Sequence, residues 1–134
     1  MPQQPRVKPE LLAPAGDIEC VRAAIENGAD AVYFGLEVGM NARERTQNIS
    51  LDDLPEIIEL LHGRGVLGYI TLNILAFSDE LPQCAERIPR FAAAGADAVL
   101  VQDLGLARMI KRVCPDLSIH ASTQMTITCS LHGI

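Results

Sequence analysis

The chain of 134 residues contains no tryptophan, and aromatic residues make up only 4% of it. Aromatic platforms on which nucleic-acid bases could stack are therefore scarce. No apolar run reaches the roughly 20 residues that a membrane-spanning helix needs, so we expect no membrane partner. Blocks rich in lysine or arginine are missing too, and the formal net charge is −6. The chain therefore offers no basic face for non-specific nucleic-acid binding.

The first nine residues contain three prolines and no apolar stretch. A secretory signal peptide needs an apolar segment, so we expect a cytoplasmic protein. We expect residues 1–9 to form a flexible arm and residues 10–134 to form the folded unit.

Sequence motifs of several well-known enzyme classes are also missing. The chain has neither a G-x-G-x-x-G nor a G-x-x-x-x-G-K-[ST] phosphate-binding loop, and neither a G-x-S-x-G nor an H-E-x-x-H motif. The cysteines form no Cys-x-x-Cys pair, which argues against a metal site. We interpret them as reduced thiols and predict no metal ligand among Cys20, Cys84, Cys114 and Cys129.

The most informative feature that is present is a repeat. The string Gly-Ala-Asp-Ala-Val occurs at residues 28–32 and again at 95–99, each time between an amphipathic stretch and an apolar run. Glycine commonly ends a helix, and the following apolar residues are typical of a buried parallel strand. About two βα units of roughly thirty residues each separate the copies. The repeat therefore predicts a βα architecture.

The hydrophobic pattern predicts five strands alternating with four helices. Asp17, Ser50, Ser78 and Asp103 are the expected helix caps, and Pro89 predicts a kink or a break in the third helix. Two α/β architectures with a parallel sheet fit this order: a five-stranded flavodoxin-like doubly wound sheet, or the first five strands of a TIM-barrel-like domain. The expected strands cover residues 11–16, 31–34, 66–72, 98–101 and 118–121.

Both architectures bring the carboxyl ends of the strands to one edge, where polar residues of this chain gather. We take Asp103 and His120 as candidate catalytic residues, although Asp103 serves equally well as a helix cap. The alternative interpretation of His120 is a hydrogen-bonded histidine at a strand end, but the polar residues 122–124 beside it favour a functional role. The candidate substrate-binding residues are Asn41, Arg43, Asn73, Gln102, Thr123 and Gln124.

Several short motifs, taken together and in order, resemble the collagenase-like peptidase family, peptidase family U32. They are residues 10–16 (ELLAPAG), 28–35 (GADAVYFG), 41–43 (NAR), 71–73 (TLN), 101–105 (VQDLG) and 120–125 (HASTQM). The resemblance favours the barrel over the doubly wound sheet and implies a peptidase of unknown catalytic type acting on a protein or peptide.

Other branches of this family imply a different function, the hydroxylation of RNA or of the ubiquinone ring. Many family members hold a [4Fe-4S] cluster with four cysteines. In the family these lie downstream of the position matching Ile134, so we expect no cofactor within this chain. A third hypothesis is an inactive, truncated barrel fragment, which we expect to self-associate through unpaired edge strands.

Overall fold

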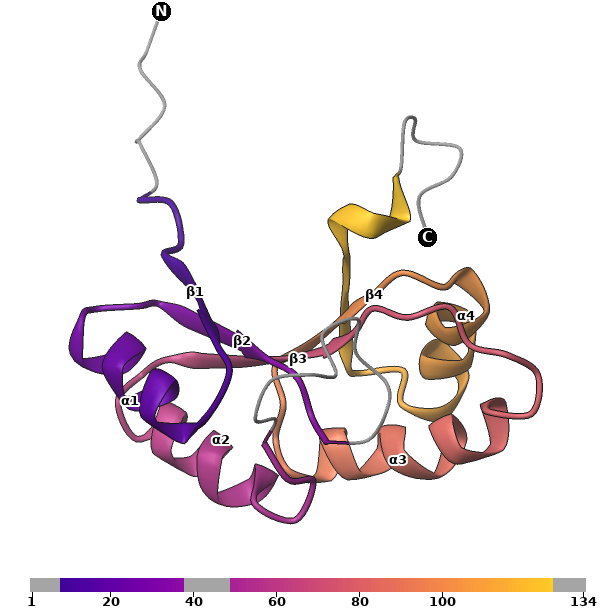
Figure 1. Cartoon of the computed structure of the whole chain (residues 1–134), viewed down its shortest axis with the longest axis horizontal. Helices are drawn as coiled ribbons and strands as arrows, with labels where there is room; N and C mark the ends of the chain where they lie inside the picture. The colour runs from indigo at the N-terminus through magenta and orange to yellow at the C-terminus, as the bar shows by residue number, and fades with distance from the viewer. Residues whose placement is uncertain (1–7, 38–48, 127–134) are drawn as a thin grey trace, which may run out of the picture.

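The computed structural model describes residues 8–37 and 49–126, and within them strands and helices alternate (Figure 1). The strands are β1 (Leu12–Ala15), β2 (Ala31–Phe34), β3 (Leu67–Leu72), β4 (Ala98–Val101) and β5 (Ser118–Ala121). The α-helices are α1 (Ile18–Glu26), α2 (Leu54–His62), α3 (Leu81–Ala93) and α4 (Leu104–Val113), and a 3-10 helix, η1, covers Thr123–Met125. The predicted alternation of strands and helices is confirmed.

The strands form one parallel sheet in the order β1-β2-β3-β4-β5. A flavodoxin-like sheet has the order 2-1-3-4-5, with helices on both faces. Here the strand order follows the chain, and α1 to α4 all lie on the same side of the sheet (Figure 1). The doubly wound alternative is therefore wrong. The described residues have the singly wound arrangement of a TIM-barrel-like domain, in a sheet that is not closed.

The main hydrophobic core lies between the sheet and the helices. Strand residues that alternate along the chain point into it, because successive side chains of a strand face opposite sides. Each of them is at most 1% exposed: Val32, Phe34, Ile70, Leu72, Val99 and Val101. They pack in the same cluster as fully or almost fully buried helix residues, among them Leu54, Ile58, Leu61, Ile88, Phe91, Leu106 and Ile110.

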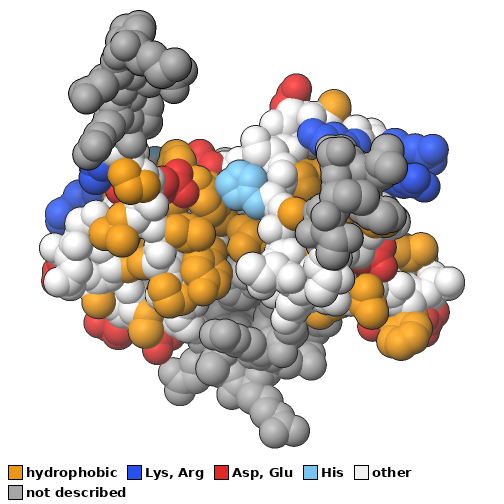
Figure 2. Space-filling model, turned by 90° about the horizontal axis from the view of Figure 1, so that it is seen from above, with side chains coloured by type: hydrophobic (Ala, Val, Ile, Leu, Met, Phe, Trp, Pro, Cys, Tyr) orange, Lys and Arg blue, Asp and Glu red, His pale blue; other side chains and the backbone are white. Residues whose placement is uncertain are grey.

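The opposite face of the sheet carries a second, smaller cluster of Ala31, Tyr69 and Ala98, with Tyr33 and Leu100 packed against it. No described helix covers this face, which Figure 2 shows from above with hydrophobic side chains gathered beside a histidine. In a closed barrel this face would line the interior. We call it the inner face.

Both copies of the repeat adopt the same local structure. Gly28 and Gly95 end their helices with φ of +83° and +86°, a left-handed conformation that other residues adopt only with strain. The second alanine of each copy, Ala31 or Ala98, is buried on the inner face. Each copy of the repeat thus ends a helix and begins the following strand.

The aspartate of each copy binds the neighbouring strand by two hydrogen bonds, an arrangement that we call the aspartate clamp. Asp30 Oδ2 accepts from the N–H of Leu11 at 2.8 Å, and the Asp30 N–H donates to the Leu11 carbonyl at 2.9 Å. Asp97 Oδ2 accepts from the N–H of Gly68 at 2.8 Å, and the Asp97 N–H donates to the Gly68 carbonyl at 3.0 Å. Each clamp fixes the start of one strand against the next.

We expect Asp97→Ala to lower the free energy of unfolding by about 1–3 kcal/mol, because it leaves the buried N–H of Gly68 without its acceptor. Asp97→Asn keeps an acceptor oxygen and should cost less. Urea denaturation followed by circular dichroism measures both. Asp53→Ala is the matched control, since Asp53 is exposed and its side chain makes no capping hydrogen bond. Equal losses in Asp97→Ala and Asp53→Ala would contradict the clamp.

Candidate functional site

Four of the predicted substrate-binding residues lie at the carboxyl ends of the strands. Asn73 directly follows β3, Gln102 directly follows β4, and Thr123 and Gln124 belong to η1 after β5. The Gln102 Nε2 donates to the carbonyl of Gln124 at 3.4 Å, which ties the end of β4 to the segment after β5. Amide and hydroxyl groups therefore gather along this edge of the sheet, which we call the carboxyl edge. Their role in binding stays a prediction.

The other two predicted substrate-binding residues, Asn41 and Arg43, lie outside the described residues. Their predicted contribution to the carboxyl edge is neither supported nor contradicted.

Asp103 caps α4, as its position predicts. Its Oδ1 accepts from the N–H of Leu106 at 2.9 Å, one of the backbone donors that a helix start leaves without an intrahelical partner. Ser122 does the same for η1, where its Oγ accepts from the N–H of Gln124 at 3.3 Å. The capping role of Asp103 is confirmed, and its catalytic role stays a prediction.

His120 lies on β5 with its side chain exposed. It pairs in register with Leu100, so it belongs to the inner face. Its ring meets the ring of Tyr69 edge-on, with centroids 4.8 Å apart and planes at 81°. Among the described residues, Asp103 and His120 share no hydrogen bond: the first binds the backbone of α4 and the second contacts β3.

Sequence reasoning missed Tyr69 and Glu10. Tyr69 is 4% exposed, and its hydroxyl donates to the Glu10 carboxylate, at 3.0 Å to Oε1 and 2.9 Å to Oε2. Burial, followed by the hydrogen bond and the negative charge of Glu10, raises the pKa of Tyr69 to about 12. The available signal was the second alanine of each repeat copy, which leaves room for a large side chain between Ala31 and Ala98.

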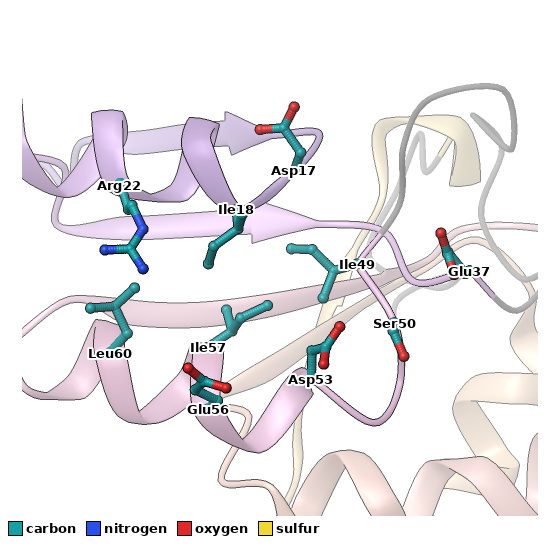
Figure 3. Close-up of a pocket in the computed structure, with 10 residues that line it drawn as sticks. All are labelled: Asp17, Ile18, Arg22, Glu37, Ile49, Ser50, Asp53, Glu56, Ile57 and Leu60. Atoms are coloured by element: carbon teal, nitrogen blue, oxygen red, sulfur yellow. The ribbon is translucent and has the colours of Figure 1, made fainter.

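A cavity of about 680 Å³ lies on the other side of the sheet, between α1 and α2 (Figure 3). Ile18, Ile57 and Leu60 form apolar parts of its wall. Its charged lining consists of one guanidinium and four carboxylates, namely Arg22, Asp17, Glu37, Asp53 and Glu56. None of the predicted site residues lines this cavity.

The described cysteines belong to three different parts of the chain: two lie on helices and the third directly follows one. Cys20 is exposed on α1, Cys84 is buried on α3, and Cys114 follows the last residue of α4. Burial raises the pKa of the Cys84 thiol, which disfavours the thiolate that a metal needs. No group of three or more potential metal ligands occurs within residues 8–37 and 49–126.

The sequence profile of peptidase family U32 matches residues 16–132. The chain belongs to this family. The match covers strands β2 to β5, the four α-helices and the carboxyl edge described above, and it confirms the resemblance inferred from the motifs.

The curated relatives that match this chain are named for two different functions, RNA hydroxylation and proteolysis. The chain is 40% identical over 118 residues to the 23S rRNA 5-hydroxycytidine synthase of Escherichia coli, covering 88% of the chain and 17% of that protein. It is 32% identical over 122 residues to tRNA hydroxylation protein P1 of Bacillus subtilis, covering 90% and 28%. It is 36% identical over 122 residues to an uncharacterized protease of Methanocaldococcus jannaschii, covering 91% and 29%.

A solved U32 peptidase has the same fold as this chain, with a TM-score of 0.73 at 13% identity. The alignment covers 97% of this chain and 56% of that one. The chain thus spans less than a third of the length of the three curated relatives and about half of the solved structure. Of the described helices, none has the length and apolar character needed to cross a membrane.

We expect Tyr69 to titrate near pH 12 and Glu10→Gln to lower its pKa toward 10 without reaching it, since burial persists in the variant. Because the raised pKa favours the neutral phenol in the folded state, its contribution to stability is full below pH 10. That contribution declines as the pH rises toward 12. The measurement is the absorbance of ionised tyrosine at increasing pH.

The titration is cleanest in a Tyr33→Phe background, because the chain has two tyrosines and Tyr69 is then the only one. Glu26→Gln, at the end of α1, is the control. A Tyr69 pKa that is the same in Glu10→Gln and Glu26→Gln would show that the bond to Glu10 is wrong.

Proposed function

We propose that this chain forms the first five strands of an RNA-hydroxylation protein. The observation that carries the proposal is the 40% identity, over 118 residues, to a 23S rRNA 5-hydroxycytidine synthase. A relative named as a tRNA hydroxylation protein supports the same class of substrate. The residues that the structure brings to the carboxyl edge are compatible with this role.

Under this proposal the carboxyl edge contacts the base that is modified. Side-chain amides recognise the edges of unstacked RNA bases by hydrogen bonds, and Asn73, Gln102 and Gln124 supply amides there. His120 would hold or transfer a proton at its imidazole. The net charge of −6 argues that the contacts to the RNA phosphates come from outside this chain.

The resemblance also implies a [4Fe-4S] cluster held by four cysteines, which would supply electron-transfer chemistry when bound. The described cysteines do not fit such a cluster, because Cys20 and Cys84 lie on different helices, Cys114 follows a third, and the three differ in exposure. We therefore assign no cluster ligand to them. The proposal places the cluster on cysteines beyond Ile134.

The second candidate function is a peptidase. It is favoured by the 36% identity to an uncharacterized protease and by a further relative named collagenase, 32% identical over 120 residues. Its substrate would be a protein or peptide. The purified full-length protein would then cleave gelatin or casein, and His120→Gln would reduce the cleavage.

Asp103 variants separate capping from catalysis. We expect Asp103→Ala to lower the free energy of unfolding by about 0.5–2 kcal/mol, whereas Asp103→Asn keeps the cap and most of the stability. If the carboxylate is catalytic, Asp103→Asn still loses activity. Urea denaturation and the RNA assay described next measure the two effects. Full activity in Asp103→Asn would contradict the predicted catalytic role.

The decisive experiment is mass spectrometry of nucleosides from 23S rRNA and tRNA of a strain that lacks the gene. We expect a hydroxylated nucleoside to disappear and to return with the wild-type gene. Loss of a general acid or base typically costs about 100-fold or more in rate, so His120→Gln should restore little of it.

His62→Gln is the matched control. The His62 Nε2 lies 2.9 Å from the Asp97 Oδ2 at the opposite end of the strands, so this variant should restore the modification. Unchanged hydroxylated nucleosides in the deletion strain, together with cleavage of gelatin by the purified protein, would replace this proposal with the peptidase.

A further inference from the structure

Glu10, Tyr69 and His120 come from alternate units of the sheet. Glu10 lies just before β1, Tyr69 belongs to β3 and His120 belongs to β5. In a TIM barrel, the side chains of one interior layer come from alternate strands in the same way. Such layers are usually filled by valine, isoleucine and leucine. A carboxylate, a phenol and an imidazole in one layer are therefore a departure from ordinary barrel packing.

The strands between them carry one small residue each beside Tyr69 on the inner face. Ala31 on β2 and Ala98 on β4 contact Tyr69 and are at most 1% exposed. Tyr69 pairs in register with Ala98, and Ala98 pairs with Ser118, two residues before His120. The small side chain of Ala98 leaves room for the tyrosine ring to reach across β4 to the imidazole, and the two ring centroids lie 4.8 Å apart.

Tyr69 is also held at its far end. Its hydroxyl donates to both oxygens of Glu10, on the side of β1. A hydrogen bond to a charged acceptor is stronger than one between neutral groups. The ring is thus anchored by Glu10 at its hydroxyl and presents its remaining surface to His120, whose own side chain is exposed.

We propose that Tyr69 is a positioning residue for His120, anchored by Glu10, so that these three side chains form one polar layer that fixes the imidazole near the carboxyl edge. An exposed histidine would otherwise move among several rotamers, and an edge-to-face aromatic contact restricts it. A misplacement of about 1 Å can cost about 100-fold in rate. The effect on RNA hydroxylation rests on the proposed function, whereas the positioning itself does not.

The positioning is tested by NMR of the imidazole protons in the full-length protein. His120→Gln identifies the His120 signals. We expect these signals to shift in Glu10→Gln, which frees the tyrosine hydroxyl, and more strongly in Tyr69→Leu, which removes the aromatic ring. Tyr33→Phe is the matched control, because Tyr33 pairs in register with Tyr69 on the same face, and it should leave the signals in place.

The consequence for activity is tested in the complemented deletion strain. We expect Tyr69→Leu to reduce the hydroxylated nucleoside about tenfold or more, while Tyr69→Phe, which keeps the ring, rescues part of it. Tyr69→Leu combined with His120→Gln should lose no more than His120→Gln alone, because both changes then remove the same function.

Two results would overturn the positioning: His120 signals that are unchanged in both Glu10→Gln and Tyr69→Leu, or losses of hydroxylation that add fully in the double variant. Thermal denaturation of Glu10→Gln and Tyr69→Phe shows that each variant is folded. If His120→Gln restores hydroxylation completely, the catalytic role of His120 is wrong. The NMR comparison then decides the positioning by itself.

Discussion

The aspartate clamp is the interaction on which the rest of the sheet depends. Parallel strands have no tight turn to set their register, and a shift by one residue would move every side chain to the opposite face. Asp30 and Asp97 prevent such a shift, because each binds both the N–H and the carbonyl of one residue, Leu11 or Gly68, on the neighbouring strand. The two copies of the repeat therefore set the register of the strands at the amino ends of β2 and β4.

Correct register separates the two faces of the sheet. One face buries valine, isoleucine, leucine and phenylalanine against the helices and supplies most of the hydrophobic stabilisation. The other face is free to carry Tyr69 between two alanines and His120 beside it. Amide groups follow at the carboxyl edge, as they do in other βα folds that bind ligands there. The residues that stabilise the fold and the candidate functional residues thus lie on different faces and at different ends of the same strands.

Local sequence patterns predicted the parts of the fold that depend on neighbouring residues: the apolar strands, the glycine helix ends and the Asp103 cap. Three local predictions were wrong. Helix α2 begins after Asp53 rather than at Ser50, and α3 begins after Glu80 rather than at Ser78. Helix α3 also continues through Pro89 without a break, since Ile88 and Phe91 in the same helix are fully or almost fully buried. The contacts of Tyr69 could not be predicted, because they join segments that are far apart in the sequence. A pattern of neighbouring residues does not indicate which side chains meet across the strands of a sheet.

The attachment of the segment before β1 has a practical consequence. Lys8 pairs with Asp30 at 3.0 Å, and Glu10 holds the buried hydroxyl of Tyr69, so these residues are anchored although their side chains lie at the surface. A protease that trims the amino terminus past residue 10 would leave a phenol in an apolar environment with its hydrogen-bonding partner gone. Removal of a purification tag from this end should therefore be checked by mass spectrometry before the protein is judged inactive.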